Sequence, residues 1–136
     1  MRRPISDRVH GVLDYAVVAI FLNAPMVLGF HGSPAAIVYW LAGIHLLLTG
    51  FTRFPLGVFR LIPFRVHGAI EVVAGIFVLV TPWIFRFAGN TAPRNFFVVM
   101  GIVILVVFAF TDYSQRVEAP PLDPNDRRRW RGAKSS

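Results

Sequence analysis

One stretch near the start of the chain occurs twice, as Arg8-Val9-His10-Gly11-Val12-Leu13-Asp14 and as Arg65-Val66-His67-Gly68-Ala69-Ile70-Glu71. In each copy a histidine precedes a carboxylate by four residues, at the entrance to a long apolar run. On a helix this spacing places both side chains on one face. The repeated stretch therefore predicts two helices whose polar faces can meet.

The composition indicates a membrane protein. Of the 136 residues, 55% are hydrophobic and 15% are charged, and the mean hydropathy is +0.59. A soluble domain of this length could not bury so much apolar surface. The absence of cysteine excludes disulfides, thiolate metal ligands and cysteine catalysis. The net charge of +7 comes from residues outside the apolar runs, as is typical of membrane topology, so we expect no nucleic-acid partner.

Four apolar runs are long enough to cross a hydrocarbon core of about 30 Å. They predict an all-α integral membrane protein with four transmembrane helices, arranged as two parallel helical-hairpin repeats. The connector has prolines and arginines among aromatic residues and is expected to lie in the interface. The expected segments are an N-terminal segment (1–8), a first hairpin (9–52), a connector (53–65), a second hairpin (66–111) and a basic tail (112–136).

The repeat extends beyond the histidine motif. A shift of 57 residues matches the first run with the third, and after a small gap the second run matches the fourth. Each unit is therefore one hairpin, and a pseudo-twofold axis is expected along the membrane normal. The matched pairs include Pro25 with Pro82, Phe30 with Phe87, Gly43 with Gly101 and Thr52 with Thr111, and in this register Val103 stands opposite His45.

The basic residues predict the orientation. Of the 14 lysines and arginines, 12 lie in the N-terminal segment, the connector and the tail. The positive-inside rule then places both termini and the connector in the cytoplasm. The tail is expected to be disordered and to bind anionic lipid headgroups. The residues expected in an aromatic belt on the opposite side are Phe30, Trp40, Trp83 and Phe87.

The ends of the first and third runs resemble a known family. They read Asn23-Ala24-Pro25-Met26-Val27-Leu28-Gly29-Phe30 and Thr81-Pro82-Trp83-Ile84-Phe85-Arg86-Phe87. These stretches are similar to the Ser-Pro-Trp signature of the SPW-repeat family of bacterial integral membrane proteins. The resemblance covers roughly residues 8 to 111. It implies paired membrane helices in a bacterial inner membrane and implies no activity.

Ionisable side chains lie inside the apolar runs at similar depth. Asp14 and Glu71 each lie about five residues, or roughly 8 Å, past the start of their helices. Such groups cost at least about 2.5 kcal/mol in a span and usually find partners, so we expect them to converge in the cytoplasmic third of the bundle. The expected cluster is His10, Asp14, His45, His67 and Glu71. The supporting candidates are Arg8, Arg65 and Tyr15.

The cluster has three interpretations, and no catalytic residue is assigned. We favour a non-enzymatic scaffold or accessory subunit, in a homo-oligomer or larger membrane complex, whose motif clasps the two hairpins while Arg8 and Arg65 neutralise the carboxylates. The second is a metal- or cofactor-dependent membrane enzyme. The third is a proton-coupled transporter or channel that acts as an oligomer. Haem or pigment ligation by His45 is disfavoured, because a lone histidine in an apolar helix is more often a packing residue. The candidate ligands of a divalent metal such as Zn, Mn or Fe are His10, Asp14, His67 and Glu71.

Overall fold

The computed structural model describes residues 3–114, which form four α-helices. Each helix is 19 to 22 residues long, and all four are long and apolar enough to cross a membrane. The predicted all-α fold with four membrane helices is confirmed. Most of the basic tail, with its expected binding to lipid headgroups, lies outside the described residues. The helices are α1 (Asp7–Leu28), α2 (Ser33–Phe51), α3 (Phe64–Ile84) and α4 (Thr91–Phe110).

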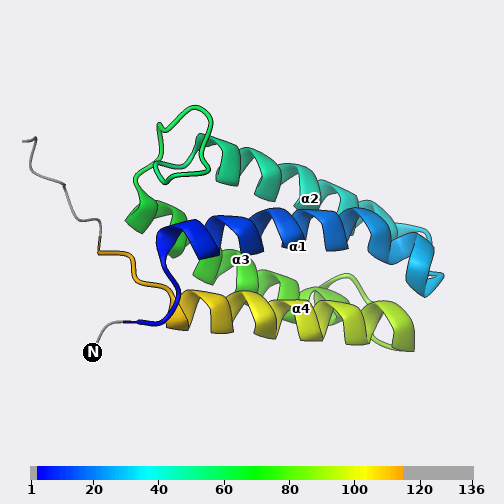
Figure 1. The fold of residues 1–136 in the computed structure, drawn as a ribbon. Coiled ribbons are helices and arrows are strands. Elements are labelled where there is room, and N and C mark those ends of the chain that lie inside the picture. The colour runs from blue at the N-terminus through cyan, green and yellow to red at the C-terminus, as the bar shows by residue number, and fades with distance from the viewer. Residues whose placement is uncertain (1–2, 115–136) are drawn as a thin grey trace, which may run out of the picture.

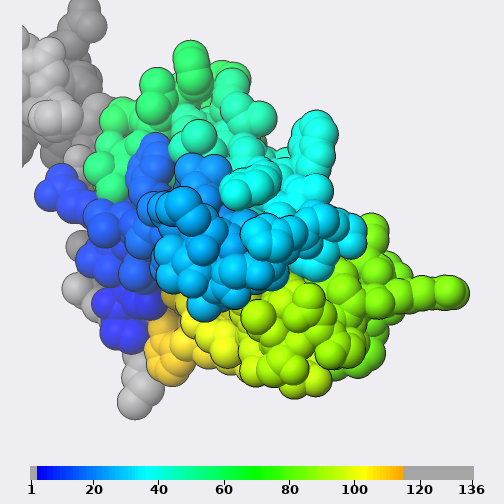
Figure 2. Space-filling view, turned by 90° about the vertical axis from the view of Figure 1, so that its right-hand side faces the viewer, coloured from blue at the N-terminus to red at the C-terminus, as the bar shows by residue number. Residues whose placement is uncertain are grey.

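The helices form two antiparallel hairpins that pack against each other. Helix α1 packs along α2, and α3 packs along α4, whereas α2 touches α3 only sparsely. The connector and both ends of the described chain lie at one end of the bundle, and the two hairpin turns lie at the other (Figure 1). Viewed from the end that carries the turns, the first hairpin lies over the second (Figure 2). We call these two ends the connector end and the turn end.

Local sequence signals set the ends of the helices. Helix α1 begins at Asp7, two residues before the expected start, because the Ser6 hydroxyl caps it by accepting from the Val9 amide at 3.3 Å. It ends where Gly29 adopts a left-handed conformation with φ of 67°. Arg86 takes the same conformation after α3, with φ of 58°. The repeat therefore extends to the way in which each first helix terminates.

The apolar core fills the turn end. Phe30 and Phe87 are buried there, with 2% and 9% of their surfaces exposed, so their expected place in an aromatic belt is wrong. The left-handed residue before each phenylalanine turns the chain toward the bundle axis at the turn end. The two rings contact phenylalanines of α4 there, at centroid distances of 5.2 to 5.7 Å. Trp40 and Trp83 remain on the surface, as expected of belt residues.

The structure corrects the register of the second half of the repeat. Residues 34, 38, 42 and 45 are buried in α2, and residues 93, 97, 101 and 104 are buried in α4. These positions differ by 59, because the second turn (85–90) is two residues longer than the first (29–32). The true pairs are Ala42 with Gly101 and His45 with Ile104, in place of the expected Gly43 with Gly101 and His45 with Val103.

Short strand-like pairings cross between the hairpins at the connector end. Ile5, before α1, pairs in parallel with Thr111, after α4. Ile62, before α3, pairs in the same way with Thr52, after α2. The start of each hairpin is thus fastened to the end of the other, next to the repeated histidines.

Candidate metal centre

The ionisable side chains of the membrane helices come together at the connector end, on the boundary between the two hairpins. Two of them come from α1 and two from α3, and a fifth comes from α2. The two motif histidines have no exposed surface, and the two carboxylates are 2% exposed. The converging side chains are His10, Asp14, His45, His67 and Glu71.

The two motif histidines face each other across the pseudo-twofold axis. Their Nε2 atoms lie 3.3 Å apart. The Nε2 atom of His10 is also 3.4 Å from Asp14 Oδ1 and 3.4 Å from Glu71 Oε2, and the Nε2 atom of His67 is 3.3 Å from Asp14 Oδ2. One ligand atom from each of these four residues lies within 4.8 Å of all the others. Their separations are those of atoms that can share one ion.

A threonine at the end of each hairpin orients each imidazole. His10 Nδ1 lies 2.8 Å from the Thr111 hydroxyl, and His67 Nδ1 lies 2.8 Å from the Thr52 hydroxyl. Each hydroxyl also donates to the carbonyl four residues earlier on its own helix, at 2.6 Å. The two arrangements are equivalent, and each histidine bonds a residue that belongs to the opposite hairpin.

Aromatic rings close the site where the motif glycines leave room for them. A Cβ atom on Gly11 would overlap the ring of Phe54, and one on Gly68 would lie 2.6 Å from Tyr113 Cε1. Phe54 and Tyr113 are therefore equivalent in position, each two residues past the threonine of its hairpin. The Tyr113 hydroxyl donates to Glu71 Oε2 at 2.8 Å. Burial, and then the charge of Glu71, raise the pKa of Tyr113 above its ordinary value, so this hydroxyl stays protonated.

The carboxylate of the first hairpin has different partners. The Thr49 hydroxyl donates to Asp14 Oδ2 at 3.4 Å. His45 Nε2 lies 3.5 Å from Asp14 Oδ1, too far for a good hydrogen bond, and has no hydrogen-bond partner among the described residues. The corresponding positions in α4 are the apolar Ile104 and Phe108. His45 therefore breaks the symmetry of the cluster.

The three supporting candidates do not join the cluster. Arg8 and Arg65 are exposed, and within residues 3–114 neither forms an ion pair with Asp14 or Glu71. Each arginine lies two residues before its histidine and so projects about 200° away from it around the helix. Tyr15 donates instead to a backbone carbonyl of the connector, at 3.0 Å. The expected neutralisation by arginine is thus not seen.

The sequence alone did not identify the hydroxyl groups that hydrogen-bond to the histidines and to Glu71. These are the two threonine hydroxyls and the Tyr113 hydroxyl. Thr52 and Thr111 did appear as a matched pair of the repeat, which was the available signal. Tyr113 has phenylalanine at the equivalent position and so left no repeated signal.

The family model described as SPW repeat domain matches residues 8–111, about three quarters of the chain. No match was found among the curated proteins or among the solved structures. The matched range covers both hairpins and both copies of the histidine motif. The chain therefore belongs to the SPW-repeat family.

Proposed function

We propose that this protein binds one divalent transition-metal ion inside the membrane, at the cluster that joins its two hairpins. The observation that carries the proposal is that four possible metal-ligand atoms converge within 4.8 Å of one another, where the carboxylates accept hydrogen bonds only from the neutral hydroxyls of Thr49 and Tyr113 among the described residues. The ligand atoms are the Nε2 atoms of His10 and His67 and the carboxylate oxygens of Asp14 and Glu71.

The threonines determine which imidazole nitrogens carry the protons. A hydroxyl has one hydrogen to donate, and Thr52 and Thr111 each give theirs to a helix carbonyl. Each hydroxyl must therefore accept a hydrogen bond from the Nδ1–H group of its histidine. In a neutral imidazole the Nε2 atom then has a free lone pair. Both lone pairs point into the cluster, as required of metal-binding imidazoles.

The charge of the cluster calls for a cation. Two carboxylates are buried at 2% exposure, and the arginines of the motif face away from them. An uncompensated buried charge is strongly destabilising, and the effect is greater in the low dielectric of a membrane interior. A dication would balance both carboxylates and would be bound by all four ligand atoms.

The separations also suit a metal ion. The two Nε2 atoms lie 3.3 Å apart, and each lies 3.3 to 3.4 Å from an oxygen of Asp14. A tetrahedron with edges of this length has its centre about 2.0–2.1 Å from each corner, within the range of a metal–ligand bond. Zinc binds histidine nitrogen and carboxylate oxygen at about 2.0–2.2 Å. Imidazole and carboxylate ligands also suit Fe(II) and Mn(II). Closed sites with four protein ligands are typically structural, which favours a structural ion over a hydrolytic one.

The metal centre retains the clasping role expected from the sequence. Each hairpin supplies one histidine and one carboxylate, so one ion would cross-link the two repeats. The competing arrangement is a clasp held by protons alone, in which one or both imidazoles are charged. In that case the Nε2 atoms of His10 and His67, only 3.3 Å apart, could share a single proton. In that arrangement the two threonines would orient imidazoles that bind no ion.

Metal analysis of the full chain tests the proposal. The protein would be purified with a tag that contains no histidine, reconstituted in lipid nanodiscs and analysed by mass spectrometry for metals. We expect about one dication per chain, lost in His67→Ala and Glu71→Ala. His31→Ala is the matched control, because His31 is an exposed turn residue. A folded wild-type protein that contains no metal and takes up no Zn, Fe or Mn in titrations would overturn the proposal in favour of the proton clasp.

We also propose that the connector end faces the cytoplasm of a bacterial inner membrane. The motif and connector arginines lie at that end, whereas only Arg86 and Arg94 flank the turns. The positive-inside rule supports this orientation. A fluorescent protein fused to the C-terminus should fluoresce, and an alkaline phosphatase fusion should be inactive. The opposite pair of results would reverse the assignment.

A further inference from the structure

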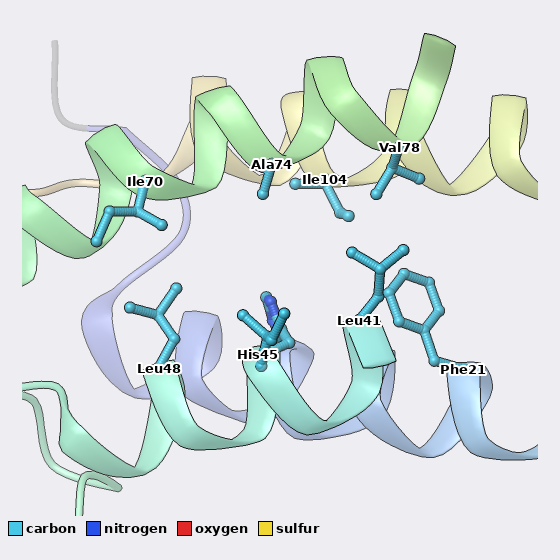
Figure 3. Close-up of a pocket in the computed structure, with 9 residues that line it drawn as sticks. Phe21, Leu41, His45, Leu48, Ile70, Ala74, Val78 and Ile104 are labelled. Carbon is cyan, nitrogen blue, oxygen red and sulfur yellow. The ribbon is translucent and has the colours of Figure 1, made fainter. Parts of the chain in front are cut away.

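A small cavity lies between the hairpins beside the candidate metal centre. Its volume is about 40 Å³, and side chains from all four helices line it. Figure 3 shows Ala74, Val78 and Ile104 across the cavity from His45 and Leu41. His45 is the only polar residue among the nine that line the cavity. This cavity is distinct from the four-residue ligand set, none of whose members lines it.

His45 connects the cavity with the cluster. Its ring is part of the cavity wall, and its Nε2 atom lies 3.5 Å from Asp14 Oδ1. This nitrogen is buried and has no hydrogen-bond partner within the described chain. A buried polar atom without a partner usually costs about 1–3 kcal/mol, so its retention calls for an explanation. The equivalent position in the second hairpin is Ile104, which avoids that cost.

The cavity opens toward lipid and is closed toward water. Ile44 and Ile70, which line it, are 57% and 42% exposed on the surface that faces the bilayer. They come from α2 and α3, the two helices that touch only sparsely. At the connector end, Phe54, Phe64 and Tyr113 pack around the cluster and close the aqueous route. A molecule would therefore enter sideways, from the membrane.

Size and polarity restrict what the cavity can hold. A water molecule needs two to four polar partners, and a single imidazole supplies too few. An ion in the cavity would lose its hydration, and the apolar wall offers no charged or hydrogen-bonding groups to replace it. A volume of about 40 Å³ is too small for a quinone ring or a lipid headgroup, since an apolar cavity that holds a benzene ring measures about 150 Å³. The remaining class is a neutral molecule of two or three non-hydrogen atoms.

We propose that this cavity binds a small uncharged ligand with the size and polarity of dioxygen, which enters from the bilayer and lies against His45. The placement of this ligand beside a metal rests on the proposed function. The occupancy of the cavity does not, because its lining contains none of the four proposed metal ligands.

Xenon is a suitable probe, because empty apolar cavities bind it. We expect a crystal of the full chain under xenon pressure to show one atom between His45 and Val78. The site should be lost in Ala74→Phe, which fills the cavity. It should be retained in Ala36→Phe, the same substitution at an exposed position of α2 outside the cavity lining. Dioxygen pressure should broaden the His45 imidazole resonances in the wild type and in Ala36→Phe only.

Several results would overturn the inference. One is an empty cavity under xenon, and another is a continuous acyl chain in its place. Equal xenon binding by Ala74→Phe and the wild type would do the same. Xenon in the cavity of a folded protein that binds no metal would refute the proposed function and leave the cavity inference standing. A metal-loaded protein without xenon would refute the cavity inference alone.

Discussion

The two halves of the cluster differ in an instructive way. Around His10 and His67 the surroundings are nearly identical, with a threonine on Nδ1 at 2.8 Å in each half and an aromatic ring over the glycine that follows. Around the carboxylates they diverge. Glu71 accepts from Tyr113, whereas Asp14 lies beside Thr49 and His45. The features that are repeated orient the imidazoles, and those that are not repeated hold the carboxylates.

This difference separates two roles within one site. The symmetric imidazoles supply two of the four proposed ligands of an ion near the twofold axis. The side around Asp14 adds the Nε2 atom of His45, which has no hydrogen-bond partner in the described part of the chain and lies beside the cavity. The duplicated motif thus accounts for the proposed ion, and the single histidine accounts for the proposed ligand beside it. Substitutions in matched pairs can test how far the equivalence extends.

The glycine pair should give the largest change in stability. Gly11→Ala and Gly68→Ala push a methyl group into the rings of Phe54 and Tyr113, so each should lose about 1–3 kcal/mol of unfolding free energy. The loss should be greater at Gly11, where the overlap is more severe. SDS unfolding in mixed micelles measures it. Gly43→Ala is the control, because nothing lies within 4 Å of its added Cβ atom. Equal stability of Gly11→Ala and Gly43→Ala would contradict the packing.

The threonine pair tests the symmetry of the imidazoles. Thr52→Val and Thr111→Val keep the shape but remove the acceptor for Nδ1–H, so each should weaken metal binding by about 10- to 100-fold. Competition with a chromophoric chelator measures the affinity. The control is Thr81→Val, because Thr81 makes the same 2.6 Å bond to its own helix and contacts no histidine. A marked difference between the two threonine variants would show that the ion does not lie between equivalent imidazoles.

Tyr113 should give the smallest effect of the three. Tyr113→Phe makes the second half resemble the first and removes one hydrogen bond to Glu71, worth about 0.6–1.7 kcal/mol in a membrane protein. Metal affinity should therefore fall by about threefold to twentyfold, while Tyr15→Phe should leave it unchanged. An affinity equal to that of the wild type would mean that Tyr113 does not position Glu71.

The same residue has a pH signature. Because burial and the charge of Glu71 raise the pKa of Tyr113, its stabilising effect is complete below about pH 10, the ordinary pKa of tyrosine, and is lost as the pH rises above that value. The ultraviolet difference between the wild type and Tyr113→Phe should show no phenolate near pH 10. A phenolate that forms at the pH of free tyrosine would show that the hydroxyl is not buried against Glu71.

Much of the fold and part of the site could be predicted from the sequence. The length of the apolar runs predicted the four helices, and the depth of Asp14, His45 and Glu71 predicted that they would meet. The role of Arg8 was misjudged because a position two residues from His10 faces the other way on a helix. The register of α4 was misjudged by one residue because the longer second turn left no feature in an apolar sequence.

The sequence by itself determined a duplicated membrane hairpin with a histidine and a carboxylate on one face of each first helix. That information is local, because periodicity and hydropathy act along a single helix. Only the tertiary structure decided that each histidine bonds a threonine of the other hairpin, and that its Nε2 atom points at its counterpart. Such pairings depend on how the two hairpins pack against each other. The local sequence pattern does not show which residues then meet when, like His10 and Thr111, they are 101 positions apart.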